Sequence, residues 1–161
     1  MRSAIGPALA LTMLAGPSAA AERHHHGLAV GAGWFDFNRQ QDQAAELRLE
    51  YRSSLRLPRL FAGAFATTDR SLYLYGAFGF DIPLGRLVLT PSFGAGAYSR
   101  GQGKELGNVL EFRSQVELAW RFRGGSRLGL SVCHISNASL GERNPGTESL
   151  TLTYEVALRR R

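Results

Sequence analysis

The sequence of 161 residues contains a single cysteine, Cys133, so no disulfide can form within the chain. After residue 21 it also lacks an uninterrupted apolar segment of the about 20 residues that a membrane-spanning helix needs. Acidic residues are few: 13 Asp and Glu stand against 19 Lys and Arg, which gives a net charge of +6. These features exclude a disulfide-rich fold and a helical membrane protein, and they favour an anionic partner.

The first 21 residues have the pattern of a secretory signal peptide. Arg2 supplies a positive charge, an apolar segment follows from Ala4 to Ala15, and Ala19 to Ala21 provide small residues for cleavage. The apolar segment is too short for a transmembrane helix. We therefore expect residues 1–21 to be removed and residues 22–161 to form a single domain. For a secreted protein, a phosphorylated lipid matches the positive charge better than nucleic acid does.

Apolar and polar side chains alternate in eight segments of the remaining chain, as they do in β-strands with two different faces. The clearest example is residues 108–122, where Val116, Leu118 and Trp120 alternate with Glu117 and Arg121. The expected strands are residues 28–37, 44–55, 60–67, 71–80, 86–98, 108–122, 128–136 and 148–158.

Two all-β architectures fit this alternation, a soluble sandwich and a transmembrane barrel. In a barrel the charged side chains would face the lumen and pair with one another. An even number of strands favours the barrel, and so does the alternation of short and longer connections. We predict an all-β fold: an eight-stranded antiparallel transmembrane β-barrel of the bacterial outer membrane. Short periplasmic turns are expected at Pro58, 81–85 and 123–126, and longer external loops near Asn38 and Thr68 and at 99–107 and 139–146.

The residues most able to take part in a chemical reaction lie in the last two predicted strands. His134 and Ser136 share the parity of the apolar Leu130 and Val132, and Glu148 shares the parity of Leu150. A base, a hydroxyl and a carboxylate should therefore project from the same, lipid-facing side of two neighbouring strands. This is the inventory of a Ser-His-acid hydrolase.

At these residues the sequence resembles the lipid A 3-O-deacylase (PagL) family of outer-membrane barrels. The family motif His-x-Ser-Asn-Ala followed by Asn-Pro-Gly-x-Glu matches residues 134–138 and 144–148. The resemblance implies an integral outer-membrane esterase whose active site faces the outer leaflet. Its implied reaction removes the ester-linked 3-hydroxyacyl chain from the 3 position of lipid A. Lipopolysaccharide and outer-membrane lipids would be its partners, no metal or other cofactor would be required, and a homodimer is left open.

Each candidate residue has an expected role. Ser136 is the nucleophile, His134 the general base, and Glu148 the carboxylate that orients the imidazole and stabilises its charged form. Donors for the oxyanion are expected among the side chains of Asn137 and Asn144 and the backbone near Gly146. The resemblance favours Asn144 over Asn137.

Other polar residues support more than one interpretation. Those in the predicted external loops are either contacts for lipid phosphates or ordinary solvated charges: Arg39, Arg70, Arg100 and Lys104. The histidines at 24–26 fit a polar terminus better than a metal site. Cys133 has inward parity and is expected to be a small buried residue.

Two other functions are compatible with the same residues. A phospholipase on the same scaffold would also cleave an acyl ester of a phosphorylated lipid. A small barrel with a structural or binding role would need none of the three candidate catalytic side chains.

Overall fold

The computed structural model describes residues 26–38, 42–55 and 57–158, so the expected signal peptide lies outside the described residues. The strands are β1 (His26–Phe35), β2 (Ala44–Arg52), β3 (Arg59–Thr67), β4 (Leu72–Gly79), β5 (Ile82–Leu84), β6 (Leu87–Ser99), β7 (Leu110–Arg121), β8 (Arg127–Ser136) and β9 (Thr147–Leu158). Within these described ranges, no helix is long and apolar enough to cross a membrane.

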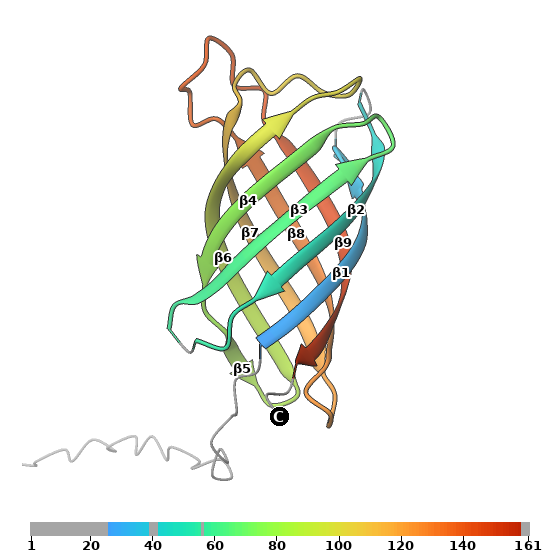
Figure 1. The fold of residues 1–161 in the computed structure, drawn as a ribbon, viewed down its shortest axis with the longest axis vertical. Coiled ribbons are helices and arrows are strands. Elements are labelled where there is room, and N and C mark those ends of the chain that lie inside the picture. The colour runs from blue at the N-terminus through green and yellow to red at the C-terminus, as the bar shows by residue number, and fades with distance from the viewer. Residues whose placement is uncertain (1–25, 39–41, 56, 159–161) are drawn as a thin grey trace, which may run out of the picture.

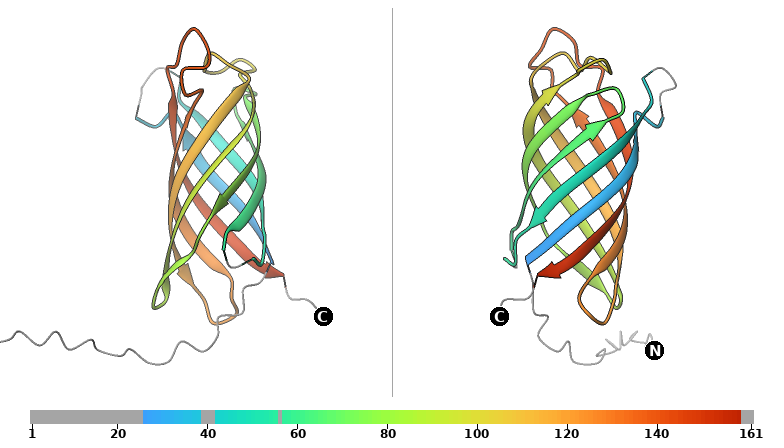
Figure 2. Two further views of the ribbon diagram at one scale, coloured as in Figure 1. Left: turned by 90° about the vertical axis from the view of Figure 1, so that its left-hand side faces the viewer. Right: turned by 45° about the vertical axis from the view of Figure 1, so that its right-hand side comes forward.

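The long strands close into a barrel (Figures 1 and 2). Neighbouring strands pair antiparallel around the ring, β4 pairs with β6, and β1 pairs with β9, so that eight strands leave no open edge. The predicted fold class is therefore confirmed. The seam between β1 and β9 matters for the site, because it fixes the last strand between β1 and β8.

One connection differs from the prediction. Residues 81–85 were expected to form a simple turn, but Ile82–Leu84 form β5, which pairs with Leu87–Leu89 of β6. The chain reverses over Gly85 and Arg86 alone, because Gly85 adopts a φ of 69° without a steric penalty. Pro91 lies between the β6 residues that pair with β4 and those that pair with β5, where a missing N–H is tolerated.

Alternation along the strands divides the barrel into a polar lumen and an apolar outer wall. In β2, Arg48, Glu50 and Arg52 are buried while Leu47 and Leu49 are exposed. Other strands continue the pattern, with exposed leucine, valine and aromatic side chains around the wall. An apolar surface of this extent is stable only in contact with lipid.

Charged side chains in the lumen form a connected set of ion pairs. Arg52 binds Glu50 at 2.8 Å, Glu117 at 2.7 Å and Glu155 at 3.0 Å. These contacts offset the cost of removing the charges from water. Together with a cluster of buried aromatic side chains, among them Phe35, Phe65 and Tyr73, these ion pairs fill the lumen and leave lipid no path through the barrel.

Through Glu155, which also binds Arg59 and Arg127, the same set of ion pairs continues to the end of the barrel where β1 begins and β9 ends. Asp81 binds Arg59 at 3.2 Å and Arg127 at 2.7 Å. Burial raises the pKa of Asp81, but the two arginines outweigh it and hold that pKa below its ordinary value. The connections after β1, β3, β6 and β8 gather at the opposite end, as the sequence predicted (Figure 1). The β3–β4 connection is not a longer loop, however, because its residues 68–71 are fewer than the residues 53–58 that join β2 to β3 at the other end.

Candidate active site

The three candidate catalytic residues lie on the outer wall at the loop-bearing end of β8 and β9. His134 is exposed and Ser136 and Glu148 are half-buried, whereas their neighbours Cys133 and Ile135 are fully buried toward the lumen. His134 and Glu148 are direct partners in the register of the two strands. The predicted outward orientation of the site is confirmed.

His134 and Glu148 form a hydrogen-bonded pair. The imidazole Nδ1 and the Glu148 Oε1 are 3.0 Å apart. The His134 side chain is 46% exposed and that of Glu148 19%, so the carboxylate is the more enclosed partner. A carboxylate at Nδ1 holds the ring proton there and leaves Nε2 to act as a base.

Ser136 shares the outward face with His134 but is not bonded to it. Residues two apart on a strand are separated by about 6.6 Å along its axis, a separation that both side chains must bridge. Within the described residues no hydrogen bond joins the two side chains. Catalytic hydrogen bonds often tighten only when substrate is bound, so this geometry is compatible with a nucleophile and its base.

Gly146 lies against the imidazole of His134. A methyl group added at Gly146 would come within 3.1 Å of His134 Cε1 and 3.4 Å of the Ile135 carbonyl oxygen. Gly146 also has a φ of 61°, which side-chain-bearing residues rarely adopt. The glycine of the motif thus lets the β8–β9 loop close over the edge of the ring.

A Gly146→Ala substitution should therefore reduce activity more than it reduces stability. Gly85→Ala is the matched control, because Gly85 also has a positive φ of 69° but has nothing within 4 Å of an added methyl group. Both variants should lose about 1 kcal/mol of unfolding free energy from backbone strain. We expect only Gly146→Ala to lose activity, by about tenfold, since a small displacement of a catalytic group has such effects. Equal activity of the two variants would contradict this role.

Asn137 has a role that the sequence did not reveal. It is fully buried, and its Nδ2 donates to the carbonyl oxygens of Leu106 at 2.8 Å and Arg143 at 2.6 Å. Its Oδ1 accepts the Ser139 N–H at 2.9 Å. Both amide hydrogens of Asn137 are thus occupied in joining the β6–β7 and β8–β9 loops.

Asn144 is exposed, and among the described residues its side chain is bonded through its oxygen only. Its Oδ1 accepts the N–H of Asn137 at 3.1 Å, which orients the side chain without using the NH2 group. Of the two asparagines of the motif, Asn144 is therefore the one with amide hydrogens to offer to a substrate.

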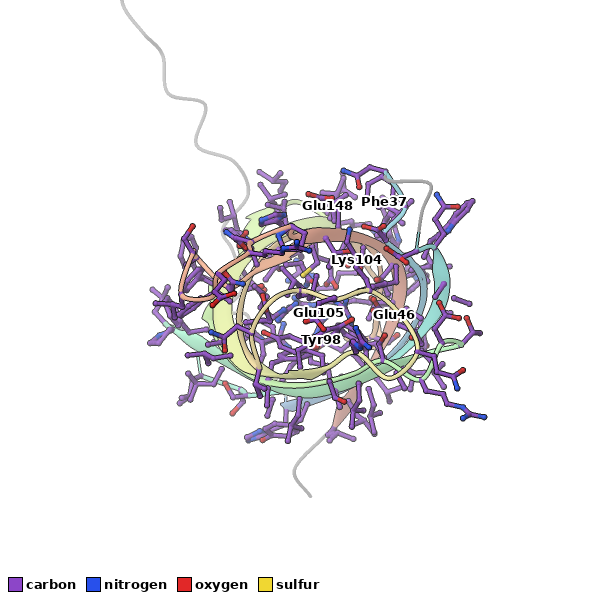
Figure 3. The ribbon with its side chains drawn as sticks, turned by 90° about the horizontal axis from the view of Figure 1, so that it is seen from above. Phe37, Glu46, Tyr98, Lys104, Glu105 and Glu148 are labelled. Atoms are coloured by element: carbon purple, nitrogen blue, oxygen red, sulfur yellow. The ribbon has the colours of Figure 1, made fainter. Side chains whose placement is uncertain are left out.

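The β6–β7 loop closes the loop-bearing end of the barrel and reaches the site. Figure 3 looks down on this end and shows Lys104 inside the rim, with Phe37 and Glu148 at the rim itself. Buried Asp36 binds Lys104 and accepts the Thr147 hydroxyl at 2.9 Å, and the Phe37 N–H donates to the Glu148 carbonyl oxygen at 3.2 Å. Residues 36 and 37 thus hold the beginning of β9, at Thr147 and at the backbone of Glu148.

Lys104→Met should destabilise the barrel by about 3 kcal/mol, because it leaves Asp36 as an unpaired buried charge. The double variant Lys104→Met/Asp36→Asn should recover much of this loss. Arg100→Met removes a largely exposed ion pair to Glu105 and should cost at most about 1 kcal/mol. Urea unfolding of the four proteins in the same lipid vesicles measures these differences, and an equal effect of Lys104→Met and Arg100→Met would contradict the account.

The structure separates the four predicted phosphate-binding residues. For Lys104 both interpretations are wrong, because its ammonium group is buried against Asp36 and faces neither lipid nor solvent. Arg70 and Arg100 are exposed at the loop-bearing end, and contact with phosphate stays a prediction for them. Arg39 lies outside the described residues. His26, from the proposed polar terminus, contacts Tyr51 and the Ser54 hydroxyl.

A groove of about 740 Å³ begins beside the site on the outer wall. Leu150, one outward position beyond Glu148, lines it together with Leu152 and Leu130 of the neighbouring strand. Trp34 and the small Ala32 of β1 lie in its middle, and residues 43–45 and Thr68 form its further side. This largely apolar surface thus runs from beside the candidate catalytic residues around the wall toward the beginning of β2.

A closed barrel with a lipid-facing wall and a His–Glu pair beside a serine defines a class: outer-membrane barrel proteins with a hydrolase-type site on the outside. The model of the family described as "Lipid A 3-O-deacylase (PagL)" matches residues 24–157. The chain belongs to this family, and it is an integral protein of the outer membrane.

Individual relatives match less of the chain than the family model does, and at low sequence identity. Lipid A deacylase PagL of Pseudomonas aeruginosa is 27% identical over 99 residues, which cover 60% of this chain and 56% of the relative. Lipid A deacylase PagL of Bordetella bronchiseptica is 31% identical over 71 residues, 43% of this chain and 40% of the relative. The chain thus matches about half the length of these curated relatives, or less.

Solved structures support the fold. The crystal structure of the outer membrane enzyme PagL superimposes with a TM-score of 0.64 at 21% identity, covering 82% of this chain and 99% of that one. A designed transmembrane β-barrel gives a TM-score of 0.63 at 9% identity, covering 85% of this chain and 98% of that one. At these identities the likeness concerns the barrel and not the chemistry.

Proposed function

We propose that the protein is a serine esterase that removes the ester-linked 3-hydroxyacyl chain from the 3 position of lipid A. The observation that carries this proposal is the His134–Glu148 pair, 3.0 Å apart, on the lipid-facing wall with Ser136 beside it. Ionisable groups facing lipid are costly and usually functional. Family membership supplies the substrate class.

The substrate approaches from the side, within the plane of the membrane. The lumen is filled by ion pairs and aromatic side chains and is closed by the β6–β7 loop, whereas the outer wall beside Glu148 carries an apolar groove. The sugar and its phosphates would lie at the level of the loops, near the exposed Arg70 and Arg100, with the acyl chains along the wall. In this arrangement the site would face the outer leaflet.

The reaction follows from the three side chains. Ser136 Oγ attacks the ester carbonyl carbon while His134 Nε2 takes the hydroxyl proton. Glu148, bonded to Nδ1, stabilises the imidazolium. The bond from the carbonyl carbon to the sugar oxygen then breaks, and His134 returns the proton to that oxygen. Water activated by His134 releases the fatty acid from Ser136.

The developing oxyanion needs hydrogen-bond donors. The side-chain NH2 of Asn144 and the backbone N–H groups of Asn144 and Gly146 are the candidates, while Pro145 between them has no N–H to offer. Asn137 acts indirectly, since its own N–H orients Asn144 and its side chain holds the loops.

Substrate choice tests the proposal. The purified protein in detergent is incubated separately with lipid A and with glycerophospholipids, and the released fatty acids are identified by mass spectrometry. Release of a 3-hydroxy fatty acid from lipid A, with little release from glycerophospholipid, is the expected result. Release from glycerophospholipid alone would make the protein a phospholipase and reject the proposal.

A further inference from the structure

One polar side chain in the middle of a lipid-facing strand is not explained by the triad. Ser114 of β7 is exposed and interrupts the outward-facing series Leu110, Phe112, Val116, Leu118 and Trp120. Among the described strands, aromatic side chains and the triad aside, outward polar residues otherwise occur only at strand ends, at His26 and Ser99. A hydroxyl in this position points to a function, because lipid offers it no hydrogen bond.

Ser114 lies directly beside the catalytic base. In the register of β7 and β8 it is the partner of His134, while Phe112 is the partner of Ser136. His134 is therefore flanked by Glu148 on one side and by Ser114 on the other. Directly opposed residues have Cβ atoms about 4.5–5.5 Å apart. No hydrogen bond involves the Ser114 hydroxyl in the part of the chain that the structure describes.

The position of Ser114 matches a particular atom of the substrate. An acyl chain whose ester lies at Ser136, and which extends away from the loops along β7 and β8, would pass over the row formed by Ser114 and His134 and then over Val116 and Val132. Rows of outward residues are about 6.8 Å apart. The third carbon of the chain is two bonds, about 2.5 Å, beyond the carbonyl carbon. Its hydroxyl thus falls between the row of Phe112 and Ser136 and the row of Ser114 and His134, within reach of Ser114 Oγ.

We propose that Ser114 binds the 3-hydroxyl of the acyl chain that is being removed and so determines the preference for 3-hydroxyacyl esters. This role rests on the proposed deacylase function. A serine hydroxyl can donate to or accept from the substrate hydroxyl. An unsubstituted chain would leave Ser114 without a partner in an apolar site, and a site built to bond a hydroxyl discriminates against an analogue that lacks it.

The test compares two synthetic esters that differ by one atom. One carries a 3-hydroxydecanoyl chain and the other a decanoyl chain on the 3 position of the same phosphorylated glucosamine, each in the same detergent micelles. Ser114→Thr keeps the hydroxyl, and Ser114→Val has the shape of threonine without it. We expect wild type and Ser114→Thr to favour the hydroxylated ester. In Ser114→Val its kcat/KM should fall about five- to tenfold, with the unsubstituted ester changed less than about twofold.

Other outcomes would overturn the proposal. An equal fall on both esters would show that Ser114 supports catalysis or structure in general, and equal cleavage of both esters by wild type would show that no such preference exists. Cleavage of neither ester, with activity on glycerophospholipid, would instead reject the deacylase function and this role with it.

Discussion

Ser136→Ala and His134→Ala should each lower the rate of fatty-acid release from lipid A by about three to six orders of magnitude. The two residues act as one unit, so the double variant should be no slower than either single variant. Measurement requires only purified protein, lipid A in detergent and quantification of the free 3-hydroxy fatty acid.

Folding must be preserved for this result to bear on chemistry. Both side chains face outward and neither packs in the lumen, so their removal should leave the barrel intact. Circular dichroism and the heat-dependent migration of the folded barrel on gels verify this. Ser99→Ala is the matched control, because Ser99 is also an outward-facing serine at a strand end near the loops. Full activity of folded Ser136→Ala would favour a non-catalytic barrel.

Glu148→Ala should lower the rate by about two to four orders of magnitude, because the imidazole then loses both its orientation and its counter-charge. Glu148→Gln separates these contributions. Its amide oxygen can still accept the Nδ1 proton, but it carries no charge to stabilise the imidazolium. We expect Glu148→Gln to be intermediate between wild type and Glu148→Ala in kcat.

The exposed loop residue Glu105 supplies the control, since Glu105→Gln removes one carboxylate without touching His134. It should leave kcat unchanged. If Glu148→Ala were as active as Glu105→Gln, the His134–Glu148 hydrogen bond would have no catalytic role and the site would have to be a different one.

The barrel and the orientation of its site could be predicted because both depend on alternation with a period of two. Leu130, Val132, His134 and Ser136 share a parity in any strand, and burial of the charged residues of the other parity then fixes which side is outside. The order of the strands followed from the short turns. None of this required knowledge of side-chain contacts.

The loops could not be predicted in the same way, because their contacts join residues far apart in the sequence. Nothing in the composition of residues 99–107 indicates that Lys104 turns inward to Asp36 or that Leu106 is fully buried. The same applies to Asn137, whose partners lie in two loops. These residues position the site but take no direct part in the proposed reaction.

Ser114 is a different case, because its signal was present in the sequence. It interrupts the apolar parity of residues 108–122, but its meaning depends on the register that places it opposite His134. A polar residue on an apolar face becomes informative only when its cross-strand neighbours are known.

The most direct test of the central claim, that Ser136 on the outer wall deacylates lipid A, is mass spectrometry of lipid A from cells expressing the protein or its Ser136→Ala variant. With the active protein, lipid A should lose the mass of one 3-hydroxyacyl chain at the 3 position, and with Ser136→Ala at equal abundance in the outer membrane it should stay intact. The same loss with both proteins, or intact lipid A with both although the protein is folded in the outer membrane, would contradict the account.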